Sequence, residues 1–146
     1  MKTLQTFVFG VSLLAGAAAH AQLKIEIAGV GSNQIPVAIA TFANEGVAPA
    51  AITSIIKADL ERSGVFKVID GAAVLSETAV IDHAQWKSRG ADALVVGSVA
   101  KLADGRIEVR YKLHDTIKGA QLSALVLSED ARFTRVVAHK IADDIY

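Results

Sequence analysis

The spacing of hydrophobic residues along this chain predicts an alternation of strands and helices. Residues 23–27 alternate apolar and charged side chains, which is typical of a half-buried strand. Gly29 and Gly31 then favour a turn. Residues 36–42 are almost continuously apolar and predict an interior strand, which tolerates Pro36 only as its first residue.

A long helix is predicted directly after this strand. Four large apolar residues recur at intervals of three or four, namely Ile52, Ile55, Ile56 and Leu60. Pro49 suits the first turn of such a helix, and Gly64 suits its C-terminal end. Because residues 65–69 predict a short strand, residues 36–69 form one strand–helix–strand crossover unit.

The remainder of the chain predicts a short helix, a β-meander and a terminal helix. In order, these are a helix from Asp82 to about Gly90, strands over residues 92–99, 106–115 and 122–127, and an amphipathic helix from Phe133 onward. Asp104 and Gly105 favour a hairpin turn. The predicted fold class is therefore α/β: a mixed β-sheet with two main helices packed on it, an α/β sandwich.

The strand over residues 106–115 has the clearest alternation in the chain. One face carries Ile107, Val109, Tyr111 and Leu113. The other carries Arg106, Glu108, Arg110, Lys112 and His114. We expect the first face to be buried and the second to be solvated.

The N-terminus has the pattern of a secretory signal peptide. Met1 and Lys2 precede an apolar run over residues 7–14, and Ala19-His20-Ala21 forms an Ala-x-Ala end. The run is shorter than the roughly 20 residues that span a bilayer. We therefore expect export, cleavage after Ala21 and a single domain over residues 22–146, with no direct insertion into a membrane.

Composition excludes several classes of site. The chain has 15 Lys and Arg residues against 15 Asp and Glu, so its formal charge is zero and provides no electrostatic footprint for nucleic acid. It has no cysteine, which excludes disulfides and thiolate zinc sites.

Candidate catalytic or metal-binding residues are few and scattered. His139 and Asp143 are four residues apart on the terminal helix and could form one edge of a metal site, but a tight site needs three or four ligands. His114 and Asp115 lie at a strand end, where Asp115 and Thr116 are expected to shape the turn. We expect no catalytic, cofactor or metal site.

A basic stripe and one tryptophan are the features that could indicate nucleic-acid binding, but each has a better interpretation. Arg106, Arg110 and Lys112 could contact phosphates, but Glu108 interrupts them and a solvated sheet face is the better interpretation. Trp86 could stack on a base, although a place in the core is more common for such a residue.

Several stretches together resemble the TolB family, the periplasmic components of the Tol–Pal system. The run Ala58-Asp59-Leu60-Glu61-Arg62-Ser63-Gly64-Val65-Phe66 is similar to that family's helix-to-strand junction. Four further similar stretches follow the family's order: residues 39–42, 86–97, 111–115 and 138–146. The resemblance covers essentially all of residues 22–146.

The resemblance implies a non-enzymatic interaction module with no cofactor. TolB proteins carry an N-terminal α/β domain, similar to the anticodon-binding domains of some tRNA synthetases, and a C-terminal β-propeller that binds Pal. Their mature N-terminus engages TolA, the system supports outer-membrane integrity and constriction during cell division, and some bacteriocins exploit it. In this chain the mobile TolA-binding segment corresponds to residues 22–33, with candidate contacts Gln22, Leu23, Lys24, Ile25, Glu26, Ile27, Gly29, Gly31, Ser32 and Asn33.

The sequence departs from the family pattern after Tyr146, because no propeller follows. Binding of Pal therefore has no residue here to which it can be assigned. A piece of a longer protein and a naturally shortened product are both open. A small nucleic-acid-binding-like module, or a periplasmic hydrolase or metal-binding domain around His114 or His139, remains the alternative function.

Overall fold

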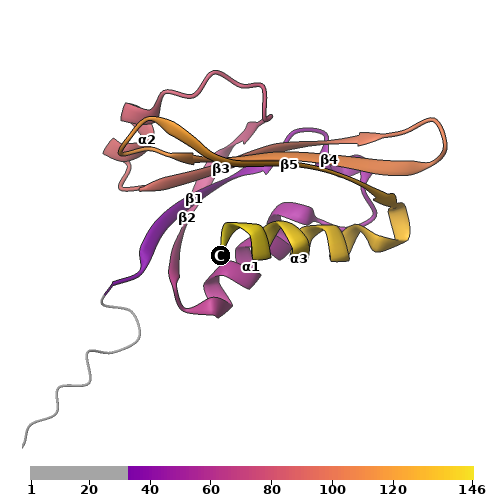
Figure 1. The fold of residues 1–146 in the computed structure, drawn as a ribbon, viewed down its shortest axis with the longest axis horizontal. Coiled ribbons are helices and arrows are strands. Elements are labelled where there is room, and N and C mark those ends of the chain that lie inside the picture. Colours follow the sequence, from indigo (N-terminus) through magenta and orange to yellow (C-terminus); the bar gives the residue numbers. More distant parts are fainter. Residues whose placement is uncertain (1–32) are drawn as a thin grey trace, which may run out of the picture.

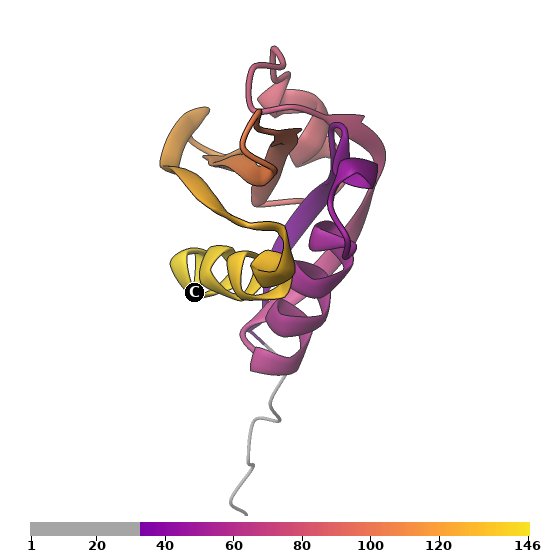
Figure 2. The same cartoon turned by 90° about the vertical axis from the view of Figure 1, so that its right-hand side faces the viewer.

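A five-stranded mixed sheet forms the centre of the molecule in the computed structural model, which describes residues 33–146. The elements are β1 (Ile35–Phe42), η1 (Glu45–Val47), α1 (Ile52–Ser63), β2 (Phe66–Leu75), α2 (His83–Ser88), β3 (Ala93–Lys101), β4 (Arg106–Asp115), β5 (Ala120–Asp130), η2 (Ala131–Phe133) and α3 (Thr134–Ile145). Helices α1 and α3 lie side by side on one face, and α2 lies on the other (Figures 1 and 2).

The strand order is β2-β1-β3-β4-β5. Strand β1 pairs in parallel with both β2 and β3, whereas β3–β4 and β4–β5 are antiparallel. This arrangement confirms the predicted α/β class with two main helices on a mixed sheet. It also confirms the crossover unit, because α1 connects the parallel neighbours β1 and β2.

Several boundaries differ from the sequence prediction, including those of β5, which covers Ala120–Asp130 where residues 122–127 were predicted. Helix α1 begins at Ile52, so Pro49 lies ahead of the helix and not in its first turn. The carboxylate of Glu45 accepts a hydrogen bond from the Thr53 N–H at 2.5 Å, which satisfies one of the donors that a helix N-terminus leaves free. Strand β2 continues to Leu75, well beyond the predicted end at residue 69.

Strand β1 is buried on both faces. Val37, Ala38, Ile39 and Ala40 are completely inaccessible to solvent. Val37 and Ile39 join the core beneath α1 and α3, and the two alanines join a smaller cluster beneath α2. The smaller cluster also contains Trp86, which is therefore a core residue.

Phe42 at the end of β1 also faces the α1–α3 core, although strict alternation from Ile39 would place it on the opposite side. A register shift between Ile39 and Thr41 coincides with this change of face. The Phe42 ring then lies over Gly97 of β3, where an added Cβ would be 2.6 Å from the ring and 2.6 Å from the Arg110 carbonyl oxygen. The sheet therefore needs glycine at this position.

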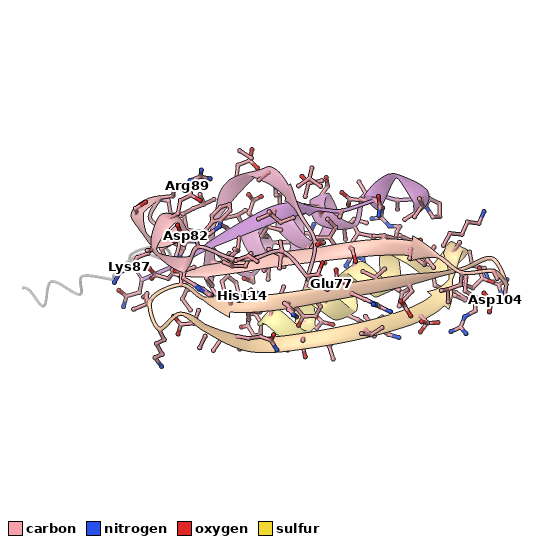
Figure 3. All side chains as sticks on the ribbon, turned by 90° about the horizontal axis from the view of Figure 1, so that it is seen from above. Glu77, Asp82, Lys87, Arg89, Asp104 and His114 are labelled. Carbon is pink, nitrogen blue, oxygen red and sulfur yellow. The ribbon has the colours of Figure 1, made fainter. Side chains whose placement is uncertain are left out.

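A pair of histidines connects α2 to the sheet. The Nε2 atom of His83 lies 3.3 Å from Nδ1 of His114, and the ring centroids are 5.3 Å apart. Figure 3 shows His114 near Asp82, which caps α2 by accepting from the Gln85 N–H at 3.1 Å. The Nε2 atom of His114 is buried and has no hydrogen-bond partner within residues 33–146.

This environment favours one neutral tautomer of His114. A buried N–H without an acceptor is rarer in proteins than an unsatisfied acceptor, so we assign the proton to Nδ1, which donates to His83. Burial lowers the pKa of His114, and the neighbouring His83 and Lys112 lower it further. Protonation would add a buried donor at Nε2 and would place the new charge beside Lys112.

We expect Gly97→Ala to lower the free energy of unfolding by about 3 kcal/mol, since the methyl group must displace both Phe42 and backbone. Gly46→Ala is the matched control, because a Cβ there meets nothing within 4 Å and should change stability by less than about 0.5 kcal/mol. Urea unfolding of both variants measures this, and equal stabilities would contradict the assigned packing.

We expect stability to fall as the pH drops below the ordinary histidine pKa of about 6.5. The folded-state pKa of His114 is lowered, so the unfolded chain binds the proton more readily and acid favours unfolding. His114→Phe should give a flatter profile of unfolding free energy between pH 7 and pH 5 than the wild type does. A wild-type profile that matches His114→Phe would contradict the assignment.

Candidate functional site

The predicted partner-binding segment lies almost entirely outside the described residues. Gln22, Leu23, Lys24, Ile25, Glu26, Ile27, Gly29, Gly31 and Ser32 all precede residue 33. Asn33 is described and is an exposed turn residue directly ahead of β1. The structure therefore gives the point at which this segment joins the folded domain.

Two hydrogen bonds fix that junction. The side-chain amide of Gln34 donates to the Gly64 carbonyl oxygen at 3.2 Å, and the Ile35 N–H donates to the Val65 carbonyl oxygen at 2.9 Å. Gly64 ends α1 in a left-handed conformation, with φ of 74°. The segment thus enters beside the end of α1 and the start of β2.

The C-terminal helix ends in the same region (Figure 1). The ring of Tyr146 packs edge-on against Phe66 with centroids 6.5 Å apart, and its side chain is largely exposed. The first residue of β1, Ile35, is also exposed. Both described chain ends and this small apolar surface therefore lie at one end of the sheet.

Of the candidate metal edge on α3, His139 contacts the neighbouring helix α1, whereas Asp143 is exposed to solvent. His139 Nδ1 lies 2.5 Å from Oδ2 of Asp59 on α1, and Arg62 Nη1 lies 3.0 Å from Oδ1 of the same carboxylate. This cluster lies in an open groove of about 340 Å³ between α1 and α3, which Arg135 also lines. Within residues 33–146, no group of three or more potential metal ligands is close enough to hold an ion.

The turn after β4 matches its prediction. The Asp115 carboxylate accepts from the N–H groups of Ile117 and Lys118, at 2.9 and 2.8 Å. The Thr116 hydroxyl donates to the Ala91 carbonyl oxygen at 2.5 Å. These bonds join the β4–β5 turn to the segment that precedes β3.

The basic stripe on β4 is partly neutralised. The guanidinium of Arg110 lies 2.6 Å from the Glu108 carboxylate, and that of Arg106 donates to the Ser128 carbonyl oxygen at 2.5 Å. Glu77, which Figure 3 shows over the middle of this face, accepts from the Ser98 hydroxyl. Charge pairing of this kind favours the interpretation of a solvated sheet face.

Sequence reasoning did not find the most perturbed titratable cluster. The Tyr111 hydroxyl donates to the Asp144 carboxylate, and the Ser123 hydroxyl donates to the same oxygen at 2.7 Å. These bonds, that from Tyr111 first, lower the pKa of Asp144. Burial, and then the carboxylate of Asp144, raise the pKa of Tyr111.

The cluster joins α3 to β4 and β5, so its role is structural. Periodicity placed Tyr111 on the buried face, and the structure confirms this. No sequence signal marks Asp144 as its partner, because the two residues meet only through tertiary packing. No helix in residues 33–146 has the length and apolar character needed to cross a membrane.

Comparisons with known proteins agree with this geometry. The family model of the TolB amino-terminal domain matches residues 23–122. The chain is 48% identical over 134 residues to the Tol-Pal system protein TolB of Dechloromonas aromatica, covering 91% of this chain and 31% of that protein. It is 43% identical over 144 residues to TolB of Bordetella avium, covering 98% of this chain and 33% of that protein.

A solved structure has the same fold. The crystal structure of TolB from Acinetobacter baumannii matches with a TM-score of 0.69 and 30% identity, over 83% of this chain and 29% of that one. The chain spans about a third of the length of the curated relatives it matches. On the family match and the shared fold together, this chain belongs to the TolB amino-terminal domain family.

Proposed function

We propose that this chain acts as a non-enzymatic interaction module of the Tol–Pal system in the periplasm, where it binds TolA through residues 22–33. The observation that carries the proposal is the extent of the family match, which begins at residue 23 and so includes this segment. In that role it supports outer-membrane integrity and envelope constriction during division, and offers a route that bacteriocins exploit. Pal would be a partner only of a propeller beyond this domain.

Strand addition is the proposed binding mode. Leu23, Ile25 and Ile27 alternate with charged residues, so an edge strand of TolA can take main-chain hydrogen bonds while the apolar side chains set the register. The bonds made by Gln34 and Ile35 hold the base of the segment on the folded domain. The segment can therefore engage a partner while the sheet keeps its structure.

The polar side chains of the described domain support a structural interpretation over a catalytic one. Glu45 binds the first turn of α1, Asp59 joins α1 to α3, and Asp144 joins α3 to the sheet. The contact that each of these carboxylates makes connects two elements of the fold. The domain is accordingly a rigid base for the N-terminal segment.

Deleting residues 22–33 from the mature chain should abolish TolA binding and leave the fold intact, since Gln34 and Ile35 keep their bonds.

As a finer test, Ile25→Asp should weaken TolA binding at least about tenfold, equivalent to about 1.4 kcal/mol. Val80→Asp is the matched control, because Val80 is fully exposed and lies far along the chain from this segment. Calorimetric titration with the periplasmic domain of TolA measures both, and retained binding by the deletion variant would refute the epitope.

Blocking signal cleavage with Ala21→Arg should weaken TolA binding, because residues 1–21 would then remain at the edge of the epitope. Mass spectrometry of the exported wild-type protein should find Gln22 at its N-terminus. Equal affinity of cleaved and uncleaved protein for TolA would break the link between processing and binding.

A further inference from the structure

Helix α2 covers one face of the sheet with only six residues. A helix of that length is not stable alone in water, where even roughly 12–15 residues are marginal, so its position depends on contacts with the sheet. Trp86, which is 5% exposed within the smaller cluster, supplies one such contact. The imidazole contact between His83 and His114 of β4 supplies another.

The two imidazole rings have no suitable place for an additional proton. The neutral pair carries two protons on four ring nitrogens. Only one proton fits between Nε2 of His83 and Nδ1 of His114, which are 3.3 Å apart, so a third proton requires that both outer nitrogens be protonated. One of these is Nε2 of His114, the buried atom without a hydrogen-bond partner within residues 33–146. The closed pair therefore gains a proton only by burying a donor that has no acceptor.

The strands around His114 provide no charge that would favour its cation. In the sheet register His114 lies beside Leu94 of β3 and Gln121 of β5, and both neighbours are uncharged. Lys112 lies two residues earlier on the same face of β4, and its ammonium repels a positive charge on the ring. The Asp115 carboxylate, next along the chain, already accepts from two N–H groups of the following turn.

The charged groups of α2 and its flanks do not bind the pair either. Figure 3 shows Asp82, Lys87 and Arg89 together at this end of the sheet. The Asp82 carboxylate accepts from a backbone N–H of its own helix, and the Arg89 guanidinium lies over the Trp86 ring, 4.8 Å from its centroid. Lys87 is exposed, and the half-buried Asp92 precedes β3. In the described part of the chain, neither imidazole is bonded to a carboxylate that would stabilise its cation.

We propose that the contact between His83 and His114 is an acid-released latch, which holds α2 on the sheet while both rings are neutral and frees it when the pair takes up a proton. Once the rings separate, water accepts the hydrogen bond from Nε2 of His114 and solvates both cations. The open state therefore binds protons that the closed state excludes, so a falling pH favours release.

Release of α2 leaves the larger part of the fold in place. The main core lies between the sheet and the α1–α3 layer and contains no residue of α2. The residues that release uncovers belong to the smaller cluster, namely Ala38, Ala40, Leu94 and Val96. Two of these are alanines, so exposing this face costs less apolar burial than exposing the face beneath α1 and α3. Helix α2 is thus a pH-controlled cover of one face of the sheet.

Amide hydrogen exchange between pH 8 and pH 5 tests the latch. The N–H groups of Arg89, Gly90 and Ala91 are bonded to carbonyl groups of α2, so their exchange, corrected for the intrinsic rate, measures its opening. Each histidine that release exposes, with the ordinary pKa of about 6.5, raises the opening constant about 30-fold at pH 5. We therefore expect a rise of about 30-fold if one ring is protonated on release and about 1,000-fold if both are.

Two variants identify the sensor. His114→Phe should abolish the rise, because a phenyl ring fills the buried position and binds no proton. His139→Gln removes the other described histidine, which contacts Asp59 on the opposite face of the sheet, and should keep the full rise. The N–H groups at the end of α2 report local opening, so a change in global stability from the lost Asp59 contact does not enter this comparison.

Nitrogen NMR spectra of the imidazoles give a second readout, which separates the latch from a general loss of stability. In the folded protein at pH 8, His114 should be neutral with its proton on Nδ1. A cationic His114 in protein whose α2 amides stay protected would overturn the proposal. Equal opening constants for α2 and β1 would also overturn it, since the whole fold would then open together, as would an α2 opening constant that does not change with pH.

Discussion

Burial of β1 on both faces is the constraint on which the rest of the structure depends. Val37 and Ile39 need the α1–α3 layer, while Ala38 and Ala40 need the α2 layer, so neither layer can be omitted without exposing the central strand. The two faces of β1 differ in the size of their side chains, since Val37 and Ile39 face the long helices and two alanines face α2. The change of face at Phe42 then directs its ring over Gly97 of β3, where the ring leaves no room for a Cβ.

The same constraint determines where the proposed binding segment is attached. Residues 22–33 are continuous with a strand that the core fixes on both sides, and Gln34 and Ile35 bond to the segment between α1 and β2. A load transmitted through the N-terminal segment would therefore reach the centre of the sheet directly. Such an attachment suits the binding role proposed for the segment.

Local patterns predicted most elements because each has a strong period. The alternation from Ile107 to Leu113 and the nearly continuous apolar run of β1 identified their strands and buried faces. The start of α1 was placed too early, because Pro49 favours a first turn locally but Glu45 holds the helix start at Ile52 through a tertiary contact. The end of β2 was missed because the bulge near Ala72 interrupts its period.

The candidate site was less accessible to the same reasoning. His114 and His139 were found by residue type, but their partners His83 and Asp59 are 31 and 80 residues away along the chain. The hydrophobic period of a single helix or strand carries no information about contacts between residues so far apart in the sequence. The binding segment at residues 22–33 was identified from the family resemblance alone. The match to the family model begins at residue 23 and so includes this segment, but TolA as its binding partner is a proposal.

Amide hydrogen exchange across the whole chain, with and without the periplasmic domain of TolA, tests most directly the division between a fixed sheet and a binding segment. The account predicts that β1 and β3 exchange slowest in the free protein, and that TolA slows exchange only within residues 22–33. Slower exchange in the α1–α3 groove or along β1 on addition of TolA, with residues 22–33 unchanged, would contradict it.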